Sequence, residues 1–446
     1  MDNKTKYIKE LSALVENKPT AKQKLWLVFL LVLIGAGAFA FFYQLRNGQI
    51  VTGMRDNVVW GIYTIFFVVF LGFSYAGALI ASILHLARVR WAKPIVRILE
   101  LIAVFSLIVG PPFILFCLGR FDRLLMIFTH GRLQSPIIWD VIAIVSDLII
   151  SIVFIFITFI KDFALLRDNT ELKIPKWRRK FYTFFAFNYK CTLKQEELLN
   201  KAHDILAAIL IPITIVAYSL LACIFAMTLK TGWHSTIFAP YFVLTAVFSG
   251  TALVIIVLWI VRKVYKLHDY ITKKHFNLLG FTMLVLCLIY GYFTFSEYFT
   301  NWYGGDLNTM MILSKLLSFH EYGWMMLTYI LLASVIPIVI IGLPWFRNVS
   351  TITFAAFTTL TGLILHRFIV IIPTQETPFL PVQDIRPEYI SYSATWVEWM
   401  LTLGGVAAFL FLFSAATKIV PVISISEMQE SLKKKKLKIF GTQPDE

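Results

Sequence analysis

The sequence predicts an all-α polytopic membrane protein with ten transmembrane helices. Of its 446 residues, 58% are hydrophobic, 15% are charged and 40 are phenylalanine. A soluble fold cannot bury that much apolar surface in one core, so much of it must face lipid. Ten apolar runs are long enough to cross a hydrocarbon core of about 30 Å. They cover residues 25–45, 58–87, 95–118, 137–160, 204–227, 237–261, 277–299, 324–345, 351–372 and 398–422.

The spans form one membrane domain, residues 25–422, because no connection is long enough for a soluble domain. A polar, lysine-rich tail, residues 1–24, precedes the first span and lacks a cleavable signal pattern. In the third span Pro111-Pro112 is expected to bend the helix. The longest loop, 167–203, is basic and is expected to contain an interfacial helix. The Pro-rich loop 374–396 is expected to be ordered against the bundle or a partner.

Basic residues predict the orientation of the spans. Thirty-two of the 41 Lys and Arg residues belong to the two tails and the even-numbered loops, and eight belong to the odd-numbered loops. The positive-inside rule therefore places both termini in the cytoplasm. The basic C-terminal tail, 423–446, is expected to lie near anionic lipid headgroups. Lipid contact of this kind accounts for the net charge of +15 without a nucleic acid partner.

A short internal repeat suggests how the spans are grouped. The Phe-Ser pair at 73–74 recurs at 248–249, 175 residues later, and an Ala-Leu pair follows in both places. Parallel repeats occur in transporters. The repeat predicts two four-helix bundles of the same orientation, spans 2–5 and 6–9, with spans 1 and 10 flanking them.

The fourth span carries a ladder of polar side chains. Its members are Asp140, Asp147, Ser151, Thr158 and Asp162. At ~100° per residue they fall within about 60° of one another, on one face of one helix. Carboxylates inside a membrane are costly and often lie on proton paths. We therefore predict a proton path along this face, with Tyr75, Glu100 and Asp269 as further members. For Asp140 and Asp162, helix capping at the headgroups is the alternative interpretation.

A second group of polar residues is predicted near the outer face. It consists of His130, Asp140, His234, Glu297, His366, Arg367 and Glu398. An aromatic belt explains the nearby tryptophans, but not an arginine inside an apolar run. A quinol site needs an apolar pocket for the tail and a histidine or carboxylate that accepts the hydroxyl proton. An arginine beside that carboxylate can hold it ionised. These residues therefore predict an outer quinone pocket.

The sequence offers no redox centre of its own. The four cysteines are scattered, without the spacing of a zinc site, an iron–sulfur cluster or covalent haem. No phosphate-binding loop or hydrolase triad is present. Non-covalent haem needs two histidines at matching depth in the membrane. No histidine lies in the middle of a span, and a pair near the outer face remains an alternative. Electrons must then pass to a partner bound on the outer face.

Several sequence runs resemble one known family. The run GRFDRLLMIFTHGRLQSPIIWD (119–140) resembles a signature of the NrfD/PsrC family, the membrane subunits of polysulfide-reductase-type complexes. That family has ten-span relatives in hydrogenase (HybB-type), sulfate-reducer and alternative complex III assemblies. Further matches follow in order: IKDFALLRD (160–168), GWHSTIFAPYFV (232–243), FTFSEYFTNWYGG (293–305), HRFIVII (366–372) and YSATWVE (392–398).

The resemblance implies a quinone-binding subunit in a prokaryotic inner membrane, not catalytic alone. It would exchange electrons between menaquinone or ubiquinone and a periplasmic, ferredoxin-like iron–sulfur subunit. Molybdopterin or multihaem cytochrome subunits would be further partners. By the same resemblance His130, Asp140, Glu297 and Arg367 form the outer quinone pocket. Tyr75 stands where ten-span relatives often have histidine, and a phenol does not titrate near neutrality, which disfavours proton pumping by the related route.

Two other classes remain as alternatives. An ion-coupled secondary transporter also has repeats and buried carboxylates. It would work alone, and its helices would be broken at matching places in both halves, yet Pro111-Pro112 has no counterpart at 286–287. A purely structural anchor predicts no acids or arginines inside the spans, unlike Asp147 and Arg367.

Overall fold

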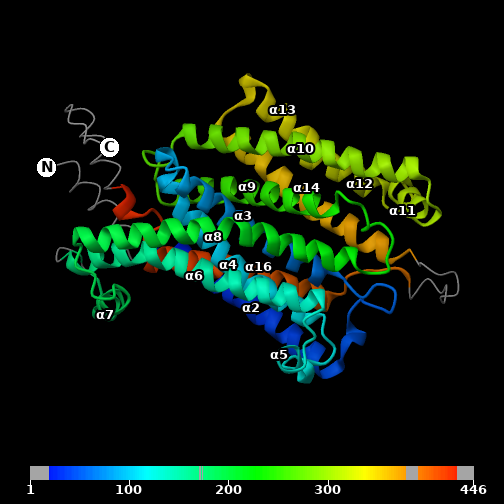
Figure 1. The fold of residues 1–446 in the computed structure, drawn as a ribbon, viewed down its shortest axis with the longest axis horizontal. Coiled ribbons are helices and arrows are strands. Elements are labelled where there is room, and N and C mark those ends of the chain that lie inside the picture. The colour runs from blue at the N-terminus through cyan, green and yellow to red at the C-terminus, as the bar shows by residue number, and fades with distance from the viewer. Residues whose placement is uncertain (1–19, 170–171, 173, 378–389, 429–446) are drawn as a thin grey trace.

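The computed structural model describes residues 20–169, 172, 174–377 and 390–428, and within them it contains helices and no strands. Among these described residues, ten helical segments are long and apolar enough to cross a membrane, which agrees with the predicted number (Figure 1). They are α2 (Ala21–Asn47), α3 (Ile62–Leu86), α4 (Lys93–Phe116), α6 (Pro136–Asp168), α8 (Leu193–Ala226), α9 (Phe238–Val264), α10 (Lys273–Gly304), the segment Gly323–Gly342, α14 (Val349–Gln375) and α16 (Trp396–Ile419).

Shorter elements connect these helices. The α-helical ones are α5 (Met126–Thr129), α7 (Lys176–Phe185) and α11 (Leu307–Leu317), and the 3-10 turns are Gln49–Val51, Arg90–Ala92, Phe121–Arg123 and Pro344–Phe346. Helix α7 occupies the basic loop in which an interfacial helix is expected. The predictions for residues 1–19, the middle of the loop 374–396 and the basic tail beyond residue 428 lie outside the described residues.

Three helices extend well beyond the predicted spans. Helices α6, α8 and α10 contain 33, 34 and 32 residues. The prediction placed the fifth span at 204–227, whereas α8 begins at Leu193, because its polar first turns contain no proline or glycine that would stop a helix. Hydropathy identifies only the part of a helix that crosses lipid. The polar turns beyond it can remain helical when their residues have favourable helix propensity.

The eighth span is interrupted by a π-helical turn. It consists of α12 (Gly323–Ile330), the π turn Leu331–Val335 and α13 (Ile336–Gly342). Pro337 lies just after this turn and has no N–H to donate to the preceding turn. The carbonyl of Ala333 instead accepts from the Cys287 thiol at 3.5 Å. A π bulge beside a proline is thus stabilised by a side chain of the neighbouring helix.

The first and last spans pack antiparallel. The Trp26 indole donates to the Ser414 hydroxyl at 3.3 Å, and at the other end of the pair the rings of Tyr43 and Trp396 lie 5.2 Å apart. The start of α2 and the end of α16 therefore lie at the same end of the bundle. We call this the terminal end, and the opposite end, which contains Asn47 and Trp396, the distal end.

The two repeated segments cross at the centre of the molecule. Helix α3 packs on α9 about as extensively as on α8. A Cβ added at Gly250 would lie 2.2 Å from the Ala76 Cβ, and one added at Gly72 would lie 3.5 Å from the Ala246 Cβ. Small residues on both helices therefore allow this close approach. Since α3 contacts helices of both repeats, the division into two bundles stays a prediction.

Candidate functional site

The larger polar cavities lie at opposite ends of the helix bundle. The distal cavity has a volume of about 60 Å³ and lies between α9, α10, α11 and α14. Its walls include Phe238, Tyr241, Glu297, Tyr298, Asn301 and His366. Glu297, which is buried, accepts from the Ser235 hydroxyl at 2.5 Å and from the Asn301 amide at 3.0 Å. Two of the predicted outer residues, Glu297 and His366, thus line one aromatic cavity.

His366 lies inside a cage of three tyrosine rings. The centroid of its ring is 5.5 Å from that of Tyr241, 5.7 Å from Tyr290 and 5.1 Å from Tyr329. The Nε2 atom is 3.0 Å from the Tyr241 hydroxyl, and Nδ1 has no hydrogen-bond partner among the described residues. The imidazole and the phenols give this cavity several groups that can donate or accept a proton.

Arg367 faces away from this cavity. Successive residues on a helix point about 100° apart, so Arg367 and His366 occupy different faces of α14. The Arg367 guanidinium donates to the hydroxyls of Tyr218, at 3.0 Å, and Thr245, and it lies 4.3 Å above the Phe242 ring. The ion pair expected between this arginine and the outer carboxylate is not formed in the described part of the chain.

The other predicted outer residues are dispersed. His130 and His234 are exposed, and His130 contacts the Thr129 hydroxyl at 2.8 Å. Glu398 is buried, and it accepts from the Tyr392 hydroxyl and the Gly53 N–H, each at 2.7 Å, and from the N–H of Thr395. These contacts tie the start of α16 to the 49–61 loop. None of these three residues lines the distal cavity.

The polar ladder of α6 faces the interior of the bundle. All five predicted members are buried, although much of α6 is exposed to the bilayer side. The Ser151 hydroxyl donates to Asp147 at 3.4 Å. Asp140 Oδ1 and Asp147 Oδ2 have no hydrogen-bond partner within the described residues. Buried polar atoms normally have partners, so this arrangement favours internal water along the ladder.

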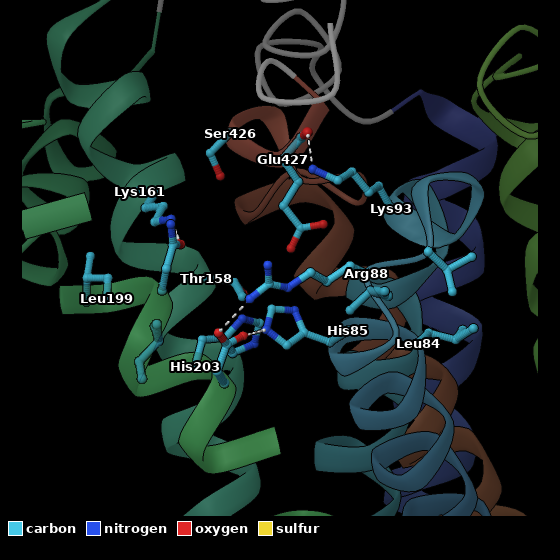
Figure 2. A pocket seen from close by; sticks show the side chains of 15 residues that line it. Leu84, His85, Arg88, Lys93, Thr158, Lys161, Leu199, His203, Ser426 and Glu427 are labelled. Atoms are coloured by element: carbon cyan, nitrogen blue, oxygen red, sulfur yellow. Dashed lines mark hydrogen bonds and ion pairs between the residues drawn. The ribbon is translucent and has the colours of Figure 1, made fainter. Parts of the chain in front are cut away.

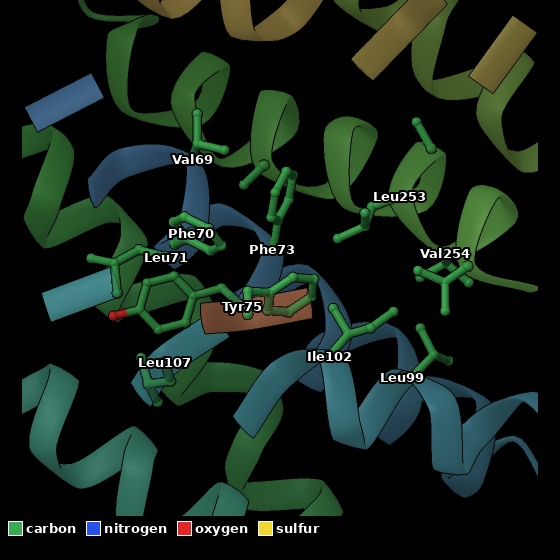
Figure 3. Close-up of a cluster of buried hydrophobic side chains, with 14 of the residues drawn as sticks. Val69, Phe70, Leu71, Phe73, Tyr75, Leu99, Ile102, Leu107, Leu253 and Val254 are labelled. Atoms are coloured by element: carbon green, nitrogen blue, oxygen red, sulfur yellow. The ribbon is translucent and has the colours of Figure 1, made fainter. Parts of the chain in front are cut away.

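Tyr75 lies beside this ladder at the edge of the central core. Its ring contacts that of Tyr218 at a centroid distance of 5.5 Å, and its buried hydroxyl has no hydrogen-bond partner among the described residues. Figure 3 shows the Tyr75 hydroxyl directed away from the apolar cluster formed by Phe70, Phe73 and Ile102. The phenol is therefore placed where it can extend the ladder toward Tyr218.

The terminal-end cavity is much larger, about 400 Å³ (Figure 2). Charged and polar residues in its walls are His85, Arg88, Lys93, Thr158, Lys161, Asn200, His203, Asp204, Ser426 and Glu427. His85 Nε2 is 2.8 Å from Asp204, which Arg88 also approaches at 3.9 Å. The rings of His85 and His203 lie 3.9 Å apart between centroids. This cavity therefore holds several groups that can carry a proton.

A buried ion network adjoins that cavity. Arg97 has 1% of its side chain exposed; its Nη1 lies 3.0 Å from Asp162 and its Nε 3.6 Å from Glu100. Glu100 also accepts from Thr158 at 3.2 Å and lies 3.7 Å from His203 Nε2. Two predicted path residues, Thr158 and Glu100, thus contact each other, and Glu100 also approaches His203, whereas Asp269 is exposed and does not line the cavity.

Asp162 has a structural role at the end of its ladder. Besides Arg97, it accepts from the N–H of Ser426 at 2.9 Å, the N–H of Ile425 at 3.3 Å and the Ser424 hydroxyl at 3.5 Å. The Arg97 cation and these three donors together provide partners for both carboxylate oxygens of Asp162. Asp162 therefore holds the chain that follows α16. This role resembles the helix capping that was the alternative interpretation of Asp162.

Sequence reasoning missed four residues of the terminal-end site: Arg97, His203, Asp204 and Glu427. Arg97 lies three residues before Glu100 inside an apolar run, a spacing that suggests a pair on one helix face. His203 and Asp204 lie at the boundary that hydropathy assigned to a loop, and Glu427 lies in the tail. Nothing in the local sequence of Glu427 indicates that it turns back into the bundle.

Comparisons with known proteins point to one family. A sequence model of the family described as polysulphide reductase, NrfD, matches residues 50–379. Among similar proteins, a dimethyl sulfoxide reductase membrane subunit of Halobacterium salinarum is 28% identical over 232 residues, which are 51% of this chain and 49% of that protein. The match thus spans about half the length of that relative.

Two further relatives align over nearly their whole length. A selenate reductase subunit of Mesobacillus selenatarsenatis is 20% identical over 413 residues, which are 90% of this chain and 95% of that protein. An Hdr-like menaquinol oxidoreductase integral membrane subunit of Archaeoglobus fulgidus is 22% identical over 418 residues, with coverage of 91% and 95%.

Proposed function

The chain belongs to the NrfD polysulphide reductase family, and on this premise we propose that it is the quinone-binding membrane subunit of a respiratory oxidoreductase. One relative is described as a menaquinol oxidoreductase membrane subunit, and two others as subunits of reductases. Within its described residues the chain has no cluster of side chains able to hold a metal ion. The proposal therefore assigns quinone binding to this chain and electron transfer to its partners.

The distal cavity is the observation that carries this proposal. A quinol loses two protons and two electrons when it is oxidised. Glu297 can accept one hydroxyl proton, and the His366–Tyr241 pair can hydrogen-bond the second oxygen. At about 10–15 Å³ of accessible space per water, the cavity has room for only a few waters, so a quinone ring requires the lining side chains to move. The aromatic walls suit both ring and tail.

Asp140 and Tyr75 favour a second candidate location for the quinone pocket near the outer face. The Asp140 carboxylate is buried on α6 with one oxygen unpartnered in the described structure, and Arg367 reaches the same side through Tyr218. His130 directly follows α5, in the connection that precedes α6. The proposed pocket can therefore be centred on Glu297 or on Asp140, and variants of Glu297 and His130 distinguish the two.

The proposed complex has an iron–sulfur partner at the distal end, on the periplasmic side of the inner membrane. Molybdopterin or multihaem subunits would follow it. We also propose that protons move along the α6 ladder, between the terminal-end cavity and Asp140. Asp140 Oδ1 and Asp147 Oδ2, which are buried and have no partner in the described part of the chain, support this path. The terminal end would then be cytoplasmic, as the basic loops predict.

The function is tested by partner dependence. The purified complex, reconstituted in liposomes with menaquinol or ubiquinol, should transfer electrons between quinol and the partner subunits. The isolated chain should bind quinone and catalyse no net electron transfer, because the proposal assigns the redox centres to the partner subunits. Ion-coupled accumulation of a solute by the isolated chain, without quinone binding, would instead establish the transporter alternative.

Orientation is tested with a topology reporter. A reporter active only in the periplasm should be inactive when fused after Glu446 and active when inserted between Gln375 and Pro387. The physical reason is the excess of Lys and Arg beside the terminal end. The reverse pattern would place the distal cavity on the cytoplasmic side and would overturn the proposed periplasmic docking.

A further inference from the structure

The chain beyond α16 turns back into the terminal-end cavity. Its backbone N–H groups at Ile425 and Ser426 donate to Asp162, and the Lys93 ammonium donates to the carbonyl of Glu427 at 3.2 Å. The N–H of Glu427 donates to the Ser424 hydroxyl at 3.4 Å, which closes a local turn. Contacts from α4 and α6 thus fix this turn across the mouth of the cavity.

The fixed turn directs one carboxylate into the cavity. Figure 2 shows the Glu427 side chain pointing inward, between the ribbons that carry Lys93 and Lys161. Burial raises the pKa of Glu427 to about 7, and the nearby negative charge of Glu100 adds to this effect. A carboxyl group in this state is both protonated and ionised in substantial amounts near neutral pH.

Charged and titratable groups surround Glu427 on every side. They are Lys93, Arg97 and Glu100 from α4, Lys161 and Asp162 from α6, His85 from α3, Arg88 from the turn after it, and His203 and Asp204 from α8. Asp204 is already shared by His85 and Arg88, and Asp162 is held by Arg97 and the tail. Because Asp204 and Asp162 are engaged in these ion pairs, Glu427 and Glu100 are better placed than they are to exchange protons.

We propose that Glu427 is the proton-carrying residue at the mouth of the terminal-end cavity, with Asp162 as its positioning residue. The inference rests on the proposed proton path. Glu427 takes a proton from water at the terminal end and releases it, through water in the cavity, to Glu100 and the adjacent His203. The carboxylate that remains is protonated again from water outside, so each step breaks one O–H or N–H bond and forms another, and no electrons are transferred. The tail is then part of the conducting machinery of the chain.

The experiment uses the complete complex in liposomes, oriented with the terminal end outward. A pH-sensitive dye outside measures proton uptake per electron, and uncoupled electron transfer is followed separately. Native uptake should fall as pH rises through about 7, because the protonated fraction of Glu427 falls. Glu427→Gln should slow uptake by about tenfold and remove this pH dependence, while uncoupled electron transfer stays unchanged. Glu427→Asp should restore much of the rate.

A matched control and a positioning variant sharpen the result. Glu197→Gln makes the same charge change at an exposed site of α8 at the terminal end, and uptake should stay native. Asp162→Asn removes a negative charge that raises the pKa of Glu427, so the midpoint of the uptake profile should move to lower pH. A purely structural role of Asp162 predicts no directed shift.

Two outcomes would overturn the inference, and they are distinguishable. If native protein takes up protons at the terminal end and Glu427→Gln has the same rate and pH profile, Glu427 does not carry them. If the native complex transfers electrons with no terminal-end uptake, the proposed proton path itself is wrong and the role of Glu427 with it. Quinone exchange at the distal end would stand in both cases.

Discussion

Glu297→Gln is expected to lower quinol-dependent electron transfer by about 100-fold, because the amide cannot accept the hydroxyl proton that quinol oxidation releases. Gln has nearly the same shape as Glu and can still hydrogen-bond to Ser235 and Asn301, so the complex should assemble normally. The measurement is steady-state electron transfer from quinol to the partner subunits in the purified complex.

Controls decide where the quinone binds. Glu321→Gln removes an exposed carboxylate at the same end and should leave the rate unchanged. His130→Ala should have little effect if the pocket is centred on Glu297. If Glu297→Gln turns over normally and His130→Ala abolishes the reaction, the quinone binds beside α5 and Asp140, and the distal cavity has another use.

Arg97→Met is expected to destabilise the folded protein by about 3–5 kcal/mol, because it leaves Asp162 and Glu100 buried without their cation. Methionine retains most of the volume that packs against the Phe159 ring, which lies 4.4 Å from the guanidinium carbon. The loss should appear as a lower unfolding temperature in detergent and as easier proteolysis after Ile419, since Asp162 holds the tail.

A second substitution tests the electrostatic cause. Adding Asp162→Asn to Arg97→Met removes one unpaired charge and should recover part of the stability. Arg88→Met is the matched control, because 86% of the Arg88 side chain is exposed and an exposed ion pair contributes little. Native stability of the Arg97→Met protein would show that water enters the network and screens its charges.

The sequence by itself determined the number of spans and which residues share one face of a helix. Apolar runs predict ten spans because each must match the bilayer, and the described residues contain ten candidate spans. Helical periodicity placed Asp140, Asp147, Ser151, Thr158 and Asp162 on one face, and all five are buried. These predictions depend on neighbours within one helix, whose geometry is nearly constant. Helix ends were less predictable, because α6, α8 and α10 continue past the lipid.

Only the tertiary structure decided which polar residues meet. Sequence depth grouped Arg367 with Glu297, yet a rotation of about 100° separates Arg367 from His366, and only His366 lines the cavity with Glu297. Asp162 and Ser426, which are 264 positions apart in the sequence, meet because the tail returns to the bundle. Contacts between distant helices depend on side-chain packing and on the cost of leaving a buried charge unpaired, and neither is visible in the local sequence.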